Sequence, residues 1–318
     1  MLKVGIFGVG HLGKFHITNW KEIEGVKIVG FFDPNNDNAN EVINTHGLKR
    51  FSDEEKLIEA CDVIDVITPT DLHYEVCMMA IRKGKHVFVE KPLALNLEEL
   101  NAIIEAYSNS TAKSTLTVGF NRRFSPHSIA VKKALEQSGP LNIVATMNAG
   151  FIPSNVWIHD LKIGGGRIIG EACHFIDLIS YLTGSKVKSV CMNSMGIDPN
   201  ENSDNASILL KYENGTNAVI NYFANGSKAY AKERIEIYHQ ERTLIMDNWR
   251  SLKGYGFRNF STARSSQDKG HQNQFNQLIA SIQNGGNQII PMDEIVNTTK
   301  ASFAAIESLK TGTWVNII

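Results

Sequence analysis

Apolar runs and helical patterns alternate along the first 120 residues of the chain. The apolar runs read KVGIFG, VKIVGFF, VIDVIT, HVFVE and STLTVGF. The segments between them have helical spacing, as from Thr70 to Gly84, where the glycine stands at a position that commonly ends a helix. Ser52 and Glu55 have the spacing of a capping box at a helix start. This alternation predicts a parallel, doubly wound sheet with helices on its faces, and hence the α/β fold class.

The pattern changes after Phe120. The segments NASILLKY and RIEIY alternate apolar and polar residues, which is typical of half-buried antiparallel strands. A later amphipathic pattern around Phe275 and Leu278 predicts a helix. We therefore expect residues 1–120 to form one domain and residues 121–318 to form a second, α+β domain with a large, mainly antiparallel open sheet. The solvent face of that sheet would suit a homodimer or homotetramer.

Composition narrows the classes of partner. Lys and Arg number 32 against 33 for Asp and Glu, so the net charge of -1 gives no electrostatic reason to expect nucleic acid or an anionic membrane. No apolar run approaches the roughly 18 to 20 residues that span a bilayer, and MLKVGIFGVG has no secretory pattern. The four cysteines lie far apart without C-x-x-C spacing, which argues against a zinc site or disulfides. These features favour a cytoplasmic protein with a small-molecule partner and no metal.

A glycine-rich motif closes the first apolar run. It extends from Gly8 to Gly13 and opens a helical segment through His11 and Leu12. In such a motif Gly8 permits the tight turn, Gly10 lets the backbone approach a pyrophosphate, and Gly13 lets helix and strand pack closely. The N–H groups at the start of the helix then attract phosphates. The alternative is an ordinary tight connection between a strand and a helix.

Asp33 strengthens the case for a dinucleotide. It ends the second apolar run about 20 residues after the motif, where a carboxylate can accept hydrogen bonds from a ribose 2'-hydroxyl. The alternative is a turn residue before Pro34. Because the carboxylate would repel a 2'-phosphate, the sequence favours NAD over NADP as the cofactor.

Two further apolar runs end in residues that can carry chemistry. Thr68-Pro69 follows VIDVI, and Glu90-Lys91-Pro92 follows HVFV. In an open parallel sheet ligands bind beyond the carboxyl ends of the strands, so we expect these residues beside the nicotinamide half of the cofactor. A lysine there can exchange a proton with a hydroxyl whose carbon loses hydride.

Together these motifs resemble a known family. The glycine motif, Glu90-Lys91-Pro92 and the later segment GGGRIIGEACHFID are similar to those of the Gfo/Idh/MocA oxidoreductases. The segments NAGFIP, NYFANG and SQDKGH resemble the branch that also forms the C-terminal part of two-domain-fusion sugar dehydrogenases. The resemblance implies a Rossmann domain followed by an α+β domain, and an NAD-dependent enzyme that acts on carbohydrates.

The resemblance also implies roles for single residues. It makes Lys91 the catalytic lysine and His174 the general base, and it implies a cis peptide between Lys91 and Pro92. Many relatives carry an aspartate four residues before this histidine, whereas this chain has Gly170. If the segment is helical, Glu171 could orient the imidazole; the alternative is a solvated or helix-capping glutamate. The spacing Glu171-x-x-His174 matches half of a di-iron motif, but the sequence has no second copy, so no metal is expected.

Other candidates for the site are less constrained. Asn121, Arg122 and Arg123 follow STLTVGF, where the resemblance implies contact with the nicotinamide and the substrate. Trp157 could stack on a sugar ring or pack between domains. His73 is a weaker candidate for the cofactor site.

These observations predict an NAD-dependent dehydrogenase that transfers hydride between nicotinamide and a secondary alcohol or ketone of a sugar or nucleotide sugar. An inositol or polyol dehydrogenase and a ketosugar reductase are the alternatives within the enzyme class. A non-catalytic regulator that senses a dinucleotide or a sugar is the alternative of another class. Lys91 and His174 argue against the regulator, whereas Gly170 argues mildly for it.

Overall fold

The computed structural model describes residues 1–135, 139–257, 260 and 262–317. Within these residues the chain divides into two compact units. The first unit contains Met1–Gly119 and Gln272–Met292, and the second contains Phe120–His271 and the segment from Asp293 onward. The functional boundary predicted at residue 120 stays a prediction. In the compact units, Gln272–Met292 groups with the N-terminal residues rather than with its neighbours in sequence.

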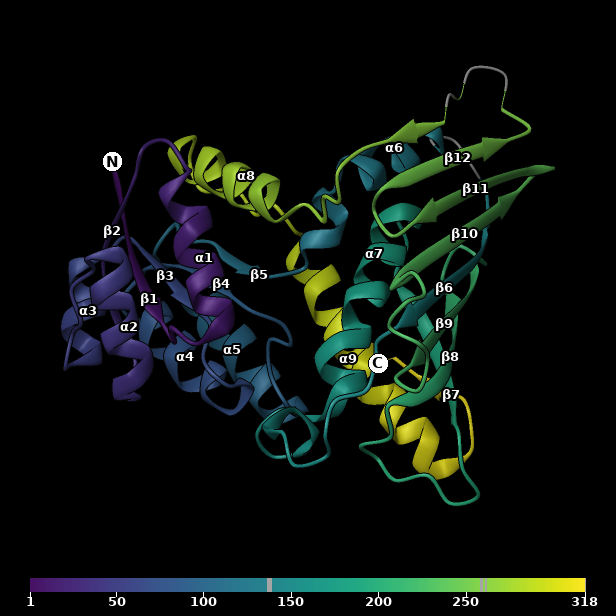
Figure 1. The fold of residues 1–318 in the computed structure, drawn as a ribbon, viewed down its shortest axis with the longest axis horizontal. Helices are drawn as coiled ribbons and strands as arrows, with labels where there is room; N and C mark the ends of the chain where they lie inside the picture. The colour runs from purple at the N-terminus through teal and green to yellow at the C-terminus, as the bar shows by residue number, and fades with distance from the viewer. Residues whose placement is uncertain (136–138, 258–259, 261, 318) are drawn as a thin grey trace. The chain divides into compact units, whose positions relative to one another are not determined.

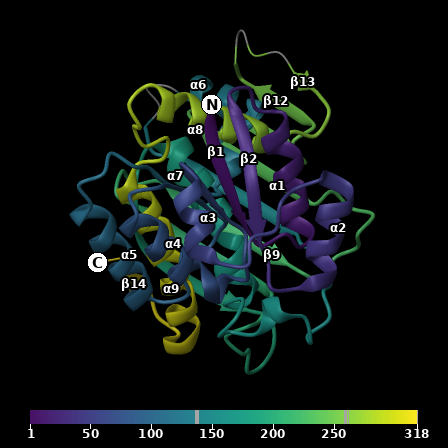
Figure 2. The same cartoon turned by 90° about the vertical axis from the view of Figure 1, so that its left-hand side faces the viewer.

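The first unit is built on a parallel sheet, as the sequence predicts. Its strands lie in the order β2-β1-β3-β4-β5 and pair in parallel throughout the described residues. The strands are β1 (Leu2–Phe7), β2 (Val26–Phe32), β3 (Val63–Val66), β4 (His86–Val89) and β5 (Leu116–Val118). Figure 2 shows β1 and β2 side by side. The carboxyl ends of all these strands therefore meet at one edge.

Helices cover both faces of this sheet. They are α1 (His11–Lys21), α2 (Asn36–His46), α3 (Glu54–Ala60), η1 (Thr70–Leu72), α4 (His73–Arg82), α5 (Leu97–Asn109) and α8 (His271–Gln283). The rings of Trp20 on α1 and Phe275 on α8 lie 4.3 Å apart, and Phe275 lies 4.9 Å from Phe88 of β4. These two helices therefore share one face. A Cβ on Gly5 of β1 would meet Leu57 of α3, which lies on the other face.

The contacts of α8 explain why its segment joins the first unit. Phe275, Leu278 and Ile279 are buried in the same core as Trp20 and Phe88. The apolar stripe predicts this helix correctly, but a stripe does not specify which sheet it covers.

One predicted helix start is wrong. Asp53, and not Ser52, is the N-cap of α3, and its carboxylate accepts the N–H of Lys56. Aspartate and serine cap helices about equally well, so the local sequence SDEE does not decide between them. Gly84, in contrast, has the positive φ of +66° expected of a glycine after a helix.

The second unit is built on a large, mostly antiparallel sheet, again as predicted. In the described residues its nine strands lie in the order β13-β12-β11-β10-β6-β9-β8-β7-β14, and only β6 and β9 pair in parallel. The strands are β6 (Asn142–Asn148), β7 (Val187–Ser194), β8 (Asn205–Tyr212), β9 (Asn217–Phe223), β10 (Glu233–His239), β11 (Arg242–Asp247), β12 (Ser251–Tyr255), β13 (Ala263–Arg264) and β14 (Val315–Asn316).

Helices cover one face of this second sheet (Figure 1). The helical segments of the unit are η2 (Asn121–Phe124), α6 (Pro126–Ala134), η3 (Trp157–His159), the π-helical turn η4 (Ile168–Ala172), α7 (Cys173–Thr183) and α9 (Met292–Thr311). Ile208 and Leu210 of β8 are buried in one core with Phe175 of α7 and Ala305 of α9. Leu209, between them, is 38% exposed. The alternation predicted for NASILLKY is therefore confirmed.

Three properties of the described residues bear on the class of protein. No helix among them is both long and apolar enough to cross a bilayer. No group of three or more His, Cys, Asp or Glu side chains among them is arranged to hold a metal ion. The cysteines are free; Cys61, Cys77 and Cys173 are buried, whereas Cys191 is only half-buried. The cytoplasmic location stays a prediction.

Candidate active site

The glycine motif forms the turn between β1 and α1. Gly8 has a φ of +88°, and a Cβ there would lie 2.5 Å from the carbonyl oxygen of Ile67. A Cβ on Gly13 would lie 2.2 Å from the carbonyl oxygen of Gly8, so the fold itself requires both glycines. At Gly10 the nearest atom to such a Cβ is 3.9 Å away. Packing does not demand glycine there, and the open backbone fits the close approach of a phosphate.

Asp33 follows β2 and is fixed against this turn. Its carboxylate accepts hydrogen bonds from the N–H of Val9 and the N–H of Asn35, each at 2.8 Å. The side chain is buried. The two donors orient both carboxylate oxygens beside the glycine motif, the position from which an acid can hold a ribose 2'-hydroxyl.

His73 connects the ends of β3 and β4. It is buried, and its ring nitrogens face the carbonyl oxygens of Pro92 at 2.8 Å and Thr68 at 3.1 Å. Burial lowers the pKa of His73, although both carbonyls favour a protonated ring. The Thr68 hydroxyl is buried and lacks a hydrogen-bond partner among the residues that the structure describes, which fits a further polar ligand. Contacts of His73, Thr68 and Pro69 with a cofactor stay predictions.

Glu90 and Lys91 follow β4 at the same edge of the sheet. The peptide between Lys91 and Pro92 is cis. Glu90 is 9% exposed, and its Oε2 accepts the N–H of Lys91 at 3.2 Å. Gly119, after β5, leaves room for this carboxylate, because a Cβ there would lie 2.6 Å from Glu90 Oε1. The structure thus brings the predicted lysine to the strand ends that also carry Thr68 and the glycine motif.

Two buried charged residues near Glu90 are not evident from the motifs. His16 of α1 has Nε2 3.2 Å from Oε1 of Glu90 and Nδ1 3.0 Å from Oδ2 of Asp65 on β3. Trp20 Nε1 donates to the same Asp65 oxygen at 2.6 Å. Burial opposes charge on His16, but Asp65 and Glu90 outweigh burial and raise its pKa to about 10. The available signal is the aspartate within the apolar run VIDVI, since a buried carboxylate requires a partner.

In the second unit, the two predicted arginines form buried ion pairs. Nε and Nη2 of Arg122 each lie 2.9 Å from a carboxylate oxygen of Glu233. Nε and Nη2 of Arg123 lie 3.0 and 2.6 Å from the oxygens of Asp177, and Nη1 lies 2.8 Å from Glu294. Both guanidinium groups therefore anchor η2 within its unit. Their contact with a substrate stays a prediction.

Glu233 is the centre of a larger buried cluster. Lys269 Nζ lies 2.6 Å from its Oε1, and Trp249 Nε1 donates to its Oε2 at 2.6 Å, in addition to Arg122. Burial alone would raise the pKa of Glu233, but Arg122 and Lys269 hold it well below its usual range. Asn121 donates its amide N–H to the carbonyl oxygen of Lys269 at 2.8 Å. The cluster ties the loop that carries Lys269 to η2. Contact of Asn121 with a substrate stays a prediction.

His174 lies in the first turn of α7, directly after η4. It is 6% exposed, and its ring lies edge-on to Phe120 with centroids 6.4 Å apart. The spacing argument for Glu171 assumes a regular helix, whereas the structure has a π-helical turn there. One turn further on, burial raises the pKa of Asp177 to about 6 against the opposing effect of Arg123. Orientation of the imidazole by Glu171 stays a prediction.

Gly170 has room for a Cβ atom. A Cβ there would meet only the carbonyl oxygen of Gly164, at an ordinary 3.5 Å, among the described residues. Gly164 cannot carry one, because its Cβ would lie 2.5 Å from Cα of Ile158. Packing therefore does not exclude an aspartate at Gly170.

Trp157 is 46% exposed in η3, so its ring is accessible to a ligand. Stacking of this ring on a sugar stays a prediction.

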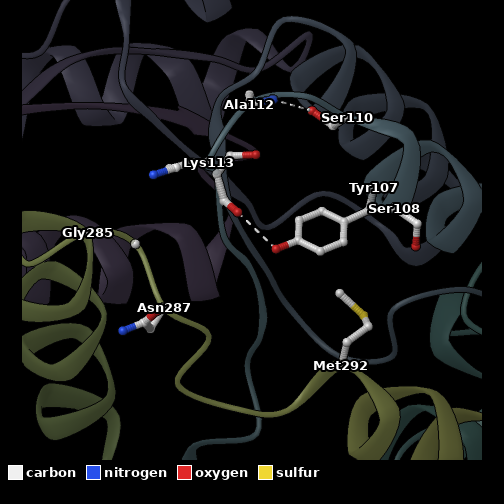
Figure 3. Close-up of a pocket in the computed structure, with 10 residues that line it drawn as sticks. Tyr107, Ser108, Ser110, Ala112, Lys113, Gly285, Asn287 and Met292 are labelled. Atoms are coloured by element: carbon white, nitrogen blue, oxygen red, sulfur yellow. Dashed lines mark hydrogen bonds between the residues drawn. The ribbon is translucent and has the colours of Figure 1, made fainter.

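A separate cavity of about 520 Å³ lies at the amino end of the first unit's sheet (Figure 3). Its lining includes Tyr107 near the end of α5, Lys113 before β5 and Asn287 after α8. The Tyr107 hydroxyl donates to the carbonyl oxygen of Ser114 at 2.9 Å. None of the predicted site residues is among the described residues that line it, so this cavity is not part of the candidate site.

The sequence matches two family descriptions. Residues 2–120 match the oxidoreductase family with an NAD-binding Rossmann fold. Residues 138–245 match the Gfo/Idh/MocA C-terminal domain.

Named relatives and solved structures agree with these matches. The chain is 27% identical to myo-inositol 2-dehydrogenase of Thermotoga maritima over 259 residues, 78% of this chain and 76% of the relative. It is 28% identical to UDP-N-acetylglucosamine 3-dehydrogenase of Acidithiobacillus ferrooxidans over 250 residues, 77% of this chain and 74% of the relative. The structure of levoglucosan dehydrogenase in complex with NADH and levoglucosan matches with a TM-score of 0.85 over 99% of both chains. At 22% identity this last match shows the shared fold.

Proposed function

The chain belongs to the Gfo/Idh/MocA oxidoreductase family, and on this premise we propose that it oxidises a secondary alcohol of a sugar or nucleotide sugar with NAD. The observation that carries the proposal is the position of Lys91. It follows β4 on the sheet edge that also carries the glycine motif and Asp33. The reverse reaction, reduction of a ketosugar, would use the same groups.

The first unit fits NAD, which supplies a hydride acceptor at its nicotinamide ring when bound. Within the described helix α1, no acidic residue lies in the first turn, and the N-cap residue Gly10 makes no side-chain hydrogen bond to the free N–H groups. The N–H groups of His11 and Leu12 can therefore face a pyrophosphate. Asp33 would hold the adenosine ribose, and Thr68 would line the nicotinamide half.

Lys91 and His174 would transfer the hydroxyl proton of the substrate. Oxidation of a secondary alcohol removes a hydride from carbon and a proton from the hydroxyl, so a base must receive that proton. We assign this role to His174. We assign to Lys91 a hydrogen bond to the substrate oxygen and relay of its proton, because an ammonium at this place stabilises charge on that oxygen.

The substrate class is suggested by the relatives. One relative is named UDP-N-acetylglucosamine 3-dehydrogenase, which favours a nucleotide sugar or another carbohydrate. A cyclic polyol is the second candidate, because the Thermotoga maritima relative is named myo-inositol 2-dehydrogenase. Trp157 and Glu171 would contact the sugar directly, and η2, with Asn121, Arg122 and Arg123, would contribute at the same site.

Identification of bound ligands tests this proposal. Mass spectrometry of small molecules released from the purified protein should detect NAD or NADH. NADH formation should then follow with at least one member of a panel of nucleotide sugars, free sugars and inositols. Bound cofactor without turnover of any member, in either direction, would contradict an enzyme and favour a sensing role.

We also propose that the uncovered face of the second sheet forms a homodimer or homotetramer interface. Leu209 of β8 and Phe223 of β9 are 38% and 36% exposed on the face away from the helices. Exposed apolar side chains grouped on one face are typical of association surfaces. Light scattering should show a dimer or tetramer that Leu209→Glu converts toward monomer. A monomeric unmutated protein would refute this interface.

A further inference from the structure

A buried ion cluster joins α1 to the strand end that carries Lys91. His16 is 1% exposed; its Nδ1 lies 3.0 Å from Asp65 and its Nε2 lies 3.2 Å from Glu90. The three residues come from different elements: His16 from α1, Asp65 from β3, and Glu90 from the position directly after β4. Because α1 begins at the glycine motif, the cluster connects the candidate phosphate site with the candidate lysine.

The remaining surroundings of His16 are aromatic. The rings of Phe88 and Phe275 lie nearly perpendicular to the imidazole at centroid distances of 5.7 and 5.2 Å. In the described part of the chain the charged groups that face the ring are Asp65 and Glu90. An imidazole can donate from both nitrogens only when it is protonated. The pKa of about 10 keeps His16 in that form at neutral pH.

Glu90 transmits this support to Lys91. One carboxylate oxygen of Glu90 faces His16, and the other accepts the backbone N–H of Lys91 at 3.2 Å. Gly119 lies against the carboxylate of Glu90, and any larger residue at this position would collide with it. Behind His16, Trp20 donates to Asp65 at 2.6 Å and fixes the far end of the cluster.

We propose that His16 is a positioning residue that fixes Glu90, and through Glu90 the backbone of Lys91, so that α1 couples the cofactor end of the site to the lysine. A charged hydrogen bond between buried groups is suited to this, because it is stronger than a neutral one. The inference rests on the proposed function, since it concerns the lysine assigned there to proton transfer.

The test compares His16→Gln with His86→Gln. Glutamine keeps one donor but removes the positive charge. His86 is a matched control, because it begins the same strand β4 and hydrogen-bonds Thr115 at 3.1 Å at the opposite end from Glu90. Both variants, with NAD added, are treated with limiting acetic anhydride over a range of pH. Mass spectrometry of peptides then reports the reactivity of each lysine amine.

We expect His16→Gln to shift the reactivity profile of Lys91 while other lysines keep theirs, and His86→Gln to leave Lys91 unchanged. With an identified substrate, kcat of His16→Gln should fall on the order of 10-fold while KM for NAD changes little, because misplacement of a catalytic group acts on the chemical step. If His16→Gln does not fold, Asp65→Asn removes support from the other side of the same imidazole and should give the same shift.

An unchanged Lys91 profile in a folded variant would overturn the proposal, even if the variant were less stable. Lysine reactivity is measured without substrate. Failure to find any substrate would therefore count against the proposed function alone, and this result would still decide the role of His16.

Discussion

Nη2 of Arg123 lies 2.6 Å from Oδ1 of Asp177, and this buried pair joins the turn after β5 to α7, the helix that carries His174 in its first turn. Arg123 is a candidate substrate ligand by sequence, yet three of its nitrogens bond to carboxylates of its own unit. Because Asp177 lies one turn after His174 on α7, the pair also fixes the helix that carries the proposed base.

Breaking this pair should destabilise the protein strongly. Arg123→Ala leaves Asp177 as a buried carboxylate without its main partner, which typically costs about 3–5 kcal/mol of unfolding free energy. Urea unfolding checks this value. Lys186→Ala is the control, since it breaks a 2.6 Å pair with Asp293 in which both side chains are exposed, and such pairs contribute about 0–1 kcal/mol. Equal losses in the two variants would show that the buried pair is unimportant.

Asp33 should determine the choice of cofactor. Asp33→Ala removes the carboxylate that Val9 and Asn35 orient, so repulsion of a 2'-phosphate should disappear. We expect the ratio of kcat/KM for NAD to that for NADP to fall on the order of 10-fold or more, which corresponds to about 1.4 kcal/mol of lost discrimination. The unmutated protein should prefer NAD, and comparable values for both cofactors would contradict the assignment of Asp33.

Gly170 offers a test of whether an aspartate four residues before His174 would assist this proposed base. A Cβ at this position makes only an ordinary contact, 3.5 Å from the carbonyl oxygen of Gly164. Gly170→Asp should therefore fold with a Tm close to that of the unmutated protein. If a carboxylate that assists His174 is what the site lacks, kcat should rise on the order of 10-fold, a small part of what general acid–base catalysis contributes. Gly170→Asn controls for size, and equal kcat values in the two variants would remove the basis for a relay there.

The stability of the fold should depend on pH through His16. Its pKa is raised from 6.5 to about 10, so its stabilising contribution is complete below about pH 6.5 and is lost as pH rises through about 10. Thermal unfolding across this window should show a falling Tm for the unmutated protein. His16→Gln should have a lower Tm at neutral pH and a smaller further fall, whereas His86→Gln should follow the unmutated protein. Parallel curves for all three would mean that His16 is neutral in the folded state.

Sequence patterns predict the parts of this molecule that depend on local order. Hydrophobic periodicity reports directly on burial. It therefore predicts the strands from KVGIFG to STLTVGF, the helix around Phe275 and the buried faces of the strands NASILLKY and RIEIY. The roles of Gly8 and Gly13 follow in the same way, since the spacing of the motif defines the turn. The helix cap at Asp53 is missed because Ser52 is an equally good local candidate.

The long-range ion pairs are not predictable in this way. Glu233 lies 111 residues from Arg122, and Asp65 lies 49 residues from His16. No periodicity links such partners, because they meet only after the sheets have formed. The sequence identifies the arginines as candidate ligands but does not reveal the buried ion pairs that they form. Nothing in the sequence distinguishes His16 from an ordinary residue of an amphipathic helix.

The central claim is that Lys91 hydrogen-bonds the substrate oxygen and relays its proton. It is tested most directly by the kcat of Lys91→Met with an identified substrate. Methionine keeps most of the side-chain length but removes the charge and the protons. NAD affinity should stay close to that of the unmutated protein, while kcat should fall on the order of 100-fold or more. Lys83→Met, at an exposed lysine paired with Glu59, should leave kcat unchanged. A near-normal kcat in Lys91→Met would show that the lysine is structural and would contradict the mechanism proposed here.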